Sequence, residues 1–210
     1  MITPNGWRQI IYKSEDIAMT TKTLPQIGAL SLQGQALRVA LGVILIAVSS
    51  KVQVPFWPVP MTMQVAVIMA LAASYGLSLG TATIVSYLAL GAAGLPVFAG
   101  TPEKGIGIAY MMGTSGGYLA GFLAATAIVG WAADNLNKLL LWPAMFVGLV
   151  ALYALGLGWL AQFAPEGKLL AWGFTPFIGG DLVKITLAAV LVLGLPASLM
   201  AKIRGAQADD

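Results

Sequence analysis

The chain contains no cysteine and no histidine among its 210 residues. The absence of thiols excludes disulfide bonds and cysteine nucleophiles. The absence of imidazoles excludes histidine-based zinc sites, histidine-ligated haem and Ser-His-Asp hydrolysis. No phosphate-binding loop of the pattern GxxxxGK[ST] is present either. We therefore do not expect this chain to hydrolyse ATP by itself.

Charged residues are also scarce. They make up 9% of the chain and hydrophobic residues 59%, whereas about a quarter of a soluble domain is charged. The mean hydropathy is +0.86, and several apolar runs are long enough to cross a hydrocarbon layer about 30 Å thick. The composition predicts an all-α, polytopic membrane protein. The net charge of +3 is too small and too dispersed to indicate nucleic-acid binding.

The apolar segments predict a compact bundle of six transmembrane helices. Residues 1–33 lack an apolar run, so we expect a cytoplasmic arm there, followed by the bundle over 34–201 and a short cytoplasmic tail over 202–210. The second and third segments are joined by so short a connection that they must form an antiparallel hairpin. The expected spans are 34–50, 61–77, 79–95, 113–133, 140–163 and 176–201.

Lysines and arginines beside these spans indicate the orientation. An even number of spans puts both termini on one side, and basic residues are more frequent in cytoplasmic loops. If the termini are cytoplasmic, that side has seven basic residues and the other side three. We therefore expect cytoplasmic termini in a cell inner membrane. The seven are Arg8, Lys13, Lys22, Arg38, Lys138, Lys202 and Arg204, and the three are Lys51, Lys104 and Lys168.

Two charges interrupt the last apolar segment, in the stretch FIGGDLVKITLAAVLVLGLP. Asp181 and Lys184 are three residues apart, so a helix places them on one face, about one to two turns below the outer surface. A charge inside the membrane costs on the order of 3 kcal/mol and usually faces the bundle interior or a cavity. The two side chains either neutralise each other or offer an acceptor and a donor to a polar ligand, and these residues alone leave both interpretations open.

The first connection, SSKVQVPFWPVPMTMQ, lies on the same side as this pair. Its closely spaced prolines predict a stiff, extended path. Phe56 and Trp57 are either interfacial aromatics or a cap over a cavity. Thr62 and Gln64 add polar groups at the start of the second span, where Thr62 could also cap the helix.

The third connection, GAAGLPVFAGTPEKGIGIAYMMGTSGGYLAGF, is rich in glycine. It is too apolar for a disordered linker, so we expect a folded loop packed over the bundle. Gly113, Gly117 and Gly121 recur every four residues, which is typical of tight helix packing. Such close approach would also bring backbone amides to a ligand.

The stretches VPFWPVPMTMQ, GAAGLPVFAGTPEKGIGIAYMMGTSGGYLAGF and GGDLVK, in this order, resemble the BioY family. These proteins are the biotin-specific S components of energy-coupling factor (ECF) vitamin transporters, and the resemblance covers roughly residues 36–200. It implies six helices, an outward-facing biotin pocket closed by the first and third loops, and no cofactor. By the same resemblance the last-helix pair binds the polar headgroup of biotin. The candidate substrate-binding residues are Asp181, Lys184, Tyr110, Phe98, Gly100, Gly117 and Gln64.

The first span, QALRVALGVILIAVSS, carries a row of small residues that begins at Ala36 and Ala40. S components of this kind use a similar AxxxA motif to dock onto the transmembrane coupling subunit, which works with ATPase subunits. Rows of small residues serve packing between helices of the same chain at least as often. Both interpretations remain open for these two alanines.

The sequence therefore favours a biotin-binding capture subunit of a vitamin uptake transporter, surrounded by membrane lipid and energised by a separate module. An integral membrane enzyme would need more than two ionisable residues inside the bundle. A channel would carry polar residues along several helices, and five of the six expected spans nearly lack them. A carrier for a different small polar metabolite is the remaining alternative.

Overall fold

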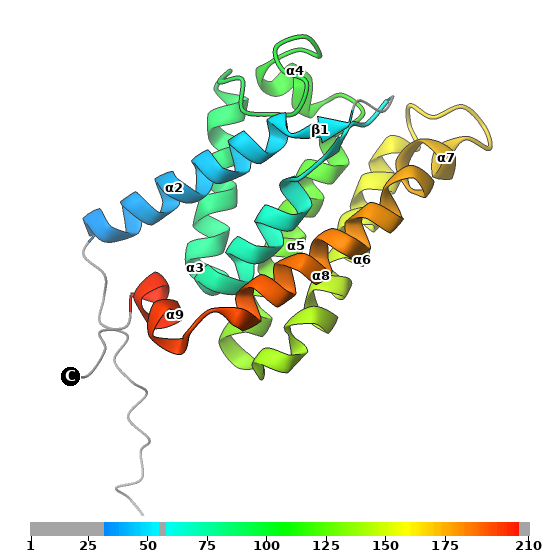
Figure 1. The fold of residues 1–210 in the computed structure, drawn as a ribbon. Helices are drawn as coiled ribbons and strands as arrows, with labels where there is room; N and C mark the ends of the chain where they lie inside the picture. Colours follow the sequence, from blue (N-terminus) through cyan, green and yellow to red (C-terminus); the bar gives the residue numbers. More distant parts are fainter. Residues whose placement is uncertain (1–31, 55–57, 206–210) are drawn as a thin grey trace, which may run out of the picture.

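The structure is a computed structural model that describes residues 32–54 and 58–205. Long helices pack side by side, with one small pair of strands at one end (Figure 1). Within the described ranges, five helical segments are long and apolar enough to cross a membrane, which agrees with the expected all-α membrane fold. They are α2 (Leu32–Lys51), α3 (Gln64–Ala92), α5 (Gly116–Asn135), α6 (Leu141–Leu160) preceded by the 3₁₀ turn η1 (Lys138–Leu140), and α8 (Thr175–Gly194) preceded by α7 (Leu169–Gly173).

Helix α3 covers both the second and the third expected span, and it is folded back on itself at Gly76. This residue has φ 77° and ψ −173°, which is not helical. The side-chain amide of Gln64 donates a 2.8 Å hydrogen bond to the hydroxyl of Tyr87, 23 residues further on. A straight helix would separate these residues by about 35 Å. The two halves of α3 therefore form the expected antiparallel hairpin, as Figure 1 also shows.

The last expected span, 176–201, is too long. Helix α8 ends at Gly194, and the short helix α9 (Ala197–Arg204) starts directly after Pro196. Proline has no backbone N–H and cannot continue a helix, so the chain bends there. Figure 1 shows α9 leaving the direction of α8, and its residues contact α3.

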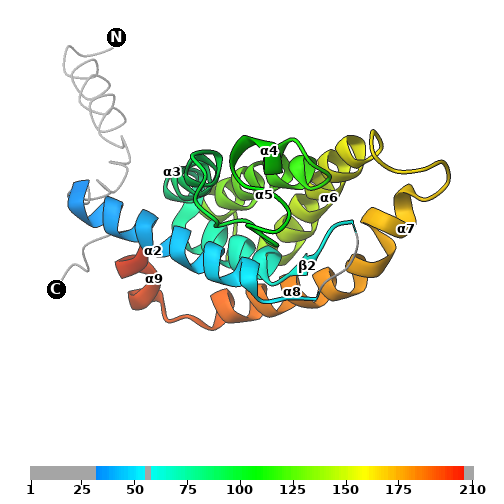
Figure 2. The ribbon, with the colours of Figure 1, turned by 90° about the horizontal axis from the view of Figure 1, so that it is seen from above.

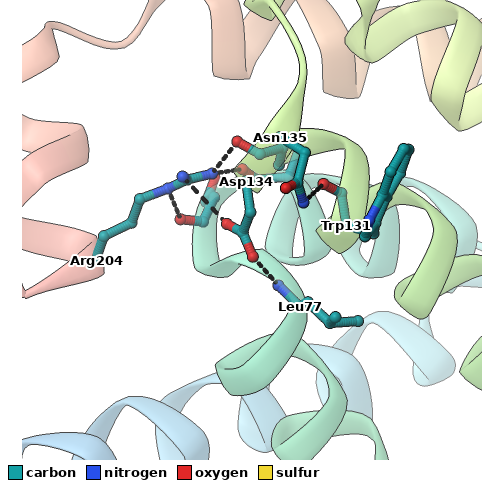
Figure 3. Close-up of polar contacts among 8 residues, drawn as sticks. Leu77, Trp131, Asp134, Asn135 and Arg204 are labelled. Atoms are coloured by element: carbon teal, nitrogen blue, oxygen red, sulfur yellow. Dashed lines mark hydrogen bonds and ion pairs between the residues drawn. The ribbon is translucent and has the colours of Figure 1, made fainter. Parts of the chain in front are cut away.

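Polar side chains from α5 and α9 hold the turn of the α3 hairpin (Figure 3). The carboxylate of Asp134 accepts a 2.8 Å hydrogen bond from the backbone N–H of Leu77, at the start of the second half of α3. The guanidinium of Arg204 lies 3.3 Å from the same carboxylate and donates to the carbonyls of Ala73 and Ser74, at the end of the first half. Backbone groups that a helix end leaves unpaired are thus satisfied at the turn.

The small elements lie at the other end of the bundle. Strand β1 (Gln53–Val54) pairs antiparallel with β2 (Met61–Thr62). The third connection contains the short helix α4 (Gly107–Met111) and buries the rings of Phe98 and Tyr110. It is therefore a folded loop packed on the bundle, as the sequence predicts, and it lies close to α2 and the strands in Figure 2.

Small residues bring α5 and α6 together. A Cβ on Gly117 would meet Trp159 and the carbonyl of Leu155, and one on Gly121 would meet the backbone of Leu152. Gly113, the first glycine of the row, precedes α5, and its carbonyl accepts a 2.9 Å bond from the indole of Trp159. This row therefore serves helix packing.

We expect Gly76→Ala to lower the free energy of unfolding by about 1 to 3 kcal/mol, because only glycine adopts this backbone conformation readily. An added Cβ would also overlap the carboxylate of Asp134. The melting temperature of the detergent-solubilised protein measures the effect. Gly158→Ala in α6 is the matched control, since a Cβ there meets no atom within 4 Å. Equal melting temperatures for both variants would contradict this account of the turn.

Candidate functional site

A half-open pocket lies between β2, the third connection and helices α3, α5, α6 and α8. About 560 Å³ of empty space lies inside the pocket and its open mouth. Its walls are largely apolar, with a few polar side chains directed at one another. The residues with polar side-chain atoms are Thr62, Gln64, Tyr110, Ser115, Tyr118, Tyr153, Asp181 and Lys184.

Asp181 and Lys184 form a buried ion pair at this pocket. The Lys184 ammonium donates a 2.8 Å hydrogen bond to Oδ1 of Asp181, three residues earlier on α8. The hydroxyl of Tyr153 donates a 2.6 Å bond to Oδ2 of the same carboxylate. Asp181 is 5% exposed and Lys184 7% exposed. The two charges neutralise each other and are also fixed in position by a third residue from α6.

The pair still has unused hydrogen-bonding capacity on the pocket side. An ammonium has three donors, and each carboxylate oxygen can accept more than one bond. Among the described residues, Asp181 is the one acceptor that the Lys184 ammonium reaches. A ligand with a carbonyl and adjacent N–H groups could therefore bind to both residues at once.

Gln64 provides a second oriented polar group. Its amide nitrogen donates to Tyr87, and its amide oxygen accepts a 3.2 Å bond from the hydroxyl of Thr62. Tyr87 in turn donates a 3.2 Å bond to the carbonyl of Val97 in the third connection. These bonds fix the amide orientation at the pocket wall and connect α3 with the third connection.

Aromatic rings form much of the remaining wall. Tyr118 donates a 2.7 Å bond to the carbonyl of Gly173 and packs edge-on against Tyr153, with ring centroids 6.4 Å apart. Tyr110 stacks on Phe98 at 4.9 Å. Burial raises the pKa of Tyr110, and a hydrogen bond with Ser115 partly offsets the rise, so this phenol is protonated at neutral pH.

Four of the seven candidate substrate-binding residues line the pocket: Gln64, Tyr110, Asp181 and Lys184. Phe98 lies behind Tyr110 and contributes through the ring stack. The two glycine candidates do not line the pocket. Gly100, at φ 71°, belongs to the turn behind the wall, and Gly117 lies at the contact between α5 and α6.

The sequence also predicts a possible aromatic cap over the pocket and a possible contact with a partner subunit. Phe56 and Trp57, expected as a possible cap, lie outside the described residues. Ala36 and Ala40 are exposed residues of the first half of α2. Val43 and Ala47, further along the same row, are packed against the core. Ala36 and Ala40 are not among the described residues of the hydrophobic core.

Sequence reasoning missed Tyr118 and Tyr153. Both occur within apolar helices, where a tyrosine ring is an ordinary core residue, and nothing local marks its hydroxyl as functional. A signal was available, because a buried tyrosine hydroxyl usually has a hydrogen-bond partner. Asp181 is the one carboxylate inside the expected spans, so a tyrosine of a neighbouring span could have been proposed as its hydrogen-bond donor.

Comparison with known proteins identifies similar chains. The sequence profile of the BioY family matches residues 19–201. The chain is 37% identical over 153 residues to a probable biotin transporter BioY of Pyrococcus horikoshii, covering 73% of this chain and 90% of that one. It is 36% identical over 163 residues to the biotin transporter BioY of Thermotoga maritima, covering 77% and 95%.

A solved structure is also similar. The crystal structure of an S-component for biotin from an ECF-type ABC transporter aligns with a TM-score of 0.66 and 25% identity. The alignment covers 78% of this chain and 93% of that chain. The likeness therefore extends over most of the helical bundle described above.

We expect Lys184→Met to destabilise the protein by about 3 to 5 kcal/mol, because it leaves the Asp181 carboxylate buried without its cation. The double variant Asp181→Asn with Lys184→Met removes both charges and should recover much of that stability. Melting temperatures in detergent measure both. A double variant that melts below Lys184→Met alone would show that the ion pair is not the relevant interaction.

Proposed function

The chain belongs to the BioY family, and we propose that it is the biotin-binding substrate-capture subunit of a vitamin uptake transporter. It is a multi-pass membrane protein, and the family consists of transport components, not enzymes. One structural observation carries the proposal: a buried, oriented acid-base pair lines an otherwise largely apolar, half-open pocket. Transport is energised by a separate module, since the sequence has no phosphate-binding loop.

The chemistry of biotin fits this pocket. Its ureido ring has N–H groups that can donate to the Asp181 carboxylate and a carbonyl that can accept from the Lys184 ammonium. The Tyr153 bond holds the carboxylate in place before the ligand arrives, which lowers the cost of ordering the site. The fused rings and the valeryl chain match the aromatic and aliphatic walls around Tyr118 and Phe122.

We further propose six membrane crossings with both termini cytoplasmic, in a cell inner membrane. The two halves of α3 count as separate crossings because the chain reverses at Gly76. Basic residues at the end of the bundle opposite the pocket support this orientation. Arg38 donates a 2.8 Å bond to the carbonyl of Lys202, and Lys138 and Arg204 line one small cavity. Basic residues of this kind favour the cytoplasmic side.

The partner of this subunit is an ECF module with a transmembrane coupling subunit and ATPase subunits. The solved structure that resembles this chain is an S-component of an ECF-type ABC transporter, which supports a partner of this class. We propose that Ala36 and Ala40 form the contact, because both are exposed on the first half of α2. Small side chains allow two helices to approach closely.

Calorimetric titration of the solubilised protein tests the ligand. We expect biotin to bind and thiamine and riboflavin not to bind. Asp181→Asn should weaken biotin binding about tenfold to a hundredfold, because it puts an amide donor beside the ureido N–H groups, and a hydrogen bond to a charged group contributes roughly 1.5 to 3 kcal/mol. Glu166→Gln, at an exposed carboxylate between α6 and α7, is the matched control and should leave biotin binding unchanged.

The titration separates three outcomes. Equal binding of all three vitamins, or of none, would reject a biotin-specific subunit. Binding of another vitamin in place of biotin would favour a carrier for a different metabolite. Wild-type affinity in a folded Asp181→Asn variant would show that biotin binds elsewhere.

We expect Ala36→Trp or Ala40→Trp to weaken co-purification with an ECF module while biotin affinity stays unchanged, because a bulky side chain separates two closely packed helices. Ala154→Trp on α6 serves as the control, since Ala154 is also exposed but lies on another helix. Pull-down of the tagged coupling subunit measures assembly. Loss of biotin binding with intact assembly would place the alanine row against the pocket side instead.

A further inference from the structure

Lys51 is the last residue of α2, at the pocket end of the bundle. Its ammonium in fact reaches across to the third connection. It donates to the carbonyl of Phe98 at 2.9 Å, to the carbonyl of Thr101 at 3.2 Å and to the hydroxyl of Thr101 at 3.1 Å. All three donors of the ammonium can thus be used on one turn of a loop about fifty residues away.

The turn that Lys51 holds is part of the pocket wall. Ala99, between the two carbonyl contacts, lines the pocket. Phe98 supports Tyr110, which also lines it, through their ring stack. The neighbouring hydroxyl of Ser50 lies 2.9 Å from the carbonyl of Val97 and 2.7 Å from that of Ala47, and it shares its one proton between them. Residues at the end of α2 therefore fix the third connection at consecutive positions.

The same end of α2 begins the first connection. Directly after Lys51 the chain enters the β1–β2 pair, and Met61 and Thr62 of β2 line the pocket. The backbone N–H of Met63 donates a 3.1 Å bond to the carbonyl of Val52, which closes this hairpin at its base. Both segments that cover the pocket are thus joined at residues 50–52.

The contact is electrostatic as well as geometric. A positive charge stabilises the carbonyl oxygens of a turn, and bonds from charged donors are stronger than neutral ones. Replacing Lys51 by an apolar residue would leave the end of α2 and the Ser50 bond in place. It would remove three hydrogen bonds from a charged donor to the 98–101 turn.

We propose that Lys51 is a positioning residue that holds the third connection against the first and thereby sets how long the ligand stays in the pocket. The proposal rests on the biotin-binding function above. Lys51 does not line the pocket, so its effect on the ligand acts through Ala99, Phe98 and Tyr110. Lys51 should therefore affect how fast the third connection opens, and with it the rate of ligand release, more than it affects the direct contacts of the ligand.

Rates of biotin binding and release measure this role, with labelled biotin and purified protein. For Lys51→Met we expect dissociation to be about tenfold faster, with an association rate that is not reduced, because the loss of a charged hydrogen-bond donor frees the cover. Lys51→Arg keeps the charge and the donors and should restore most of the slow dissociation. Lys168→Met, at an exposed lysine just before α7, is the matched control and should behave as wild type.

The outcomes distinguish this proposal from the proposed function. Absence of biotin binding by the wild-type protein would reject the function itself. Biotin binding by the wild type with unchanged dissociation from Lys51→Met would reject the role of Lys51 alone. A lower melting temperature with normal dissociation would also reject it, because that result describes a structural residue. If Lys51→Met does not fold, Ser50→Ala removes the adjacent bond to the same loop and should accelerate dissociation to a smaller extent.

Discussion

The ion pair between Asp181 and Lys184 is the constraint on which the pocket depends. Each charge alone would be costly within an apolar helix, and together, with the hydroxyl of Tyr153, they form a nearly neutral and fully oriented group. The structural and the functional interpretation of the pair therefore do not compete. The contacts that make two charges tolerable in the membrane also leave a carboxylate and an ammonium fixed at the pocket surface, ready to bind a ligand of matching polarity.

Features that depend on local sequence were predictable. Hydropathy indicated the spans, the short connection at Gly76 indicated a hairpin, and a three-residue spacing put Asp181 and Lys184 on one face. Features that depend on which helix faces meet were not predictable from one chain. Tyr153 reaches Asp181 only because α6 packs beside α8, and Gly117 is turned toward α6 and not toward the pocket. Likewise, Pro196 ends a run whose hydropathy alone continues for several more residues.

Helix α2 combines two roles along its length. Its first half exposes Ala36 and Ala40, while its last residues hold the loops that cover the pocket. A helix is stiff over this distance, so a displacement at one end reaches the other end with little loss. The proposed partner contact and the residues that hold the third connection are therefore parts of one rigid element.

Arg204 has a consequence for how the molecule is made. It follows every membrane-spanning helix in the described part of the chain, yet it holds the turn of α3, which leaves the ribosome far earlier. Until α9 has been synthesised, the carbonyls of Ala73 and Ser74 are without this donor, and Asp134 is without its cation. The turn of the α3 hairpin can therefore be completed only after translation has passed Arg204.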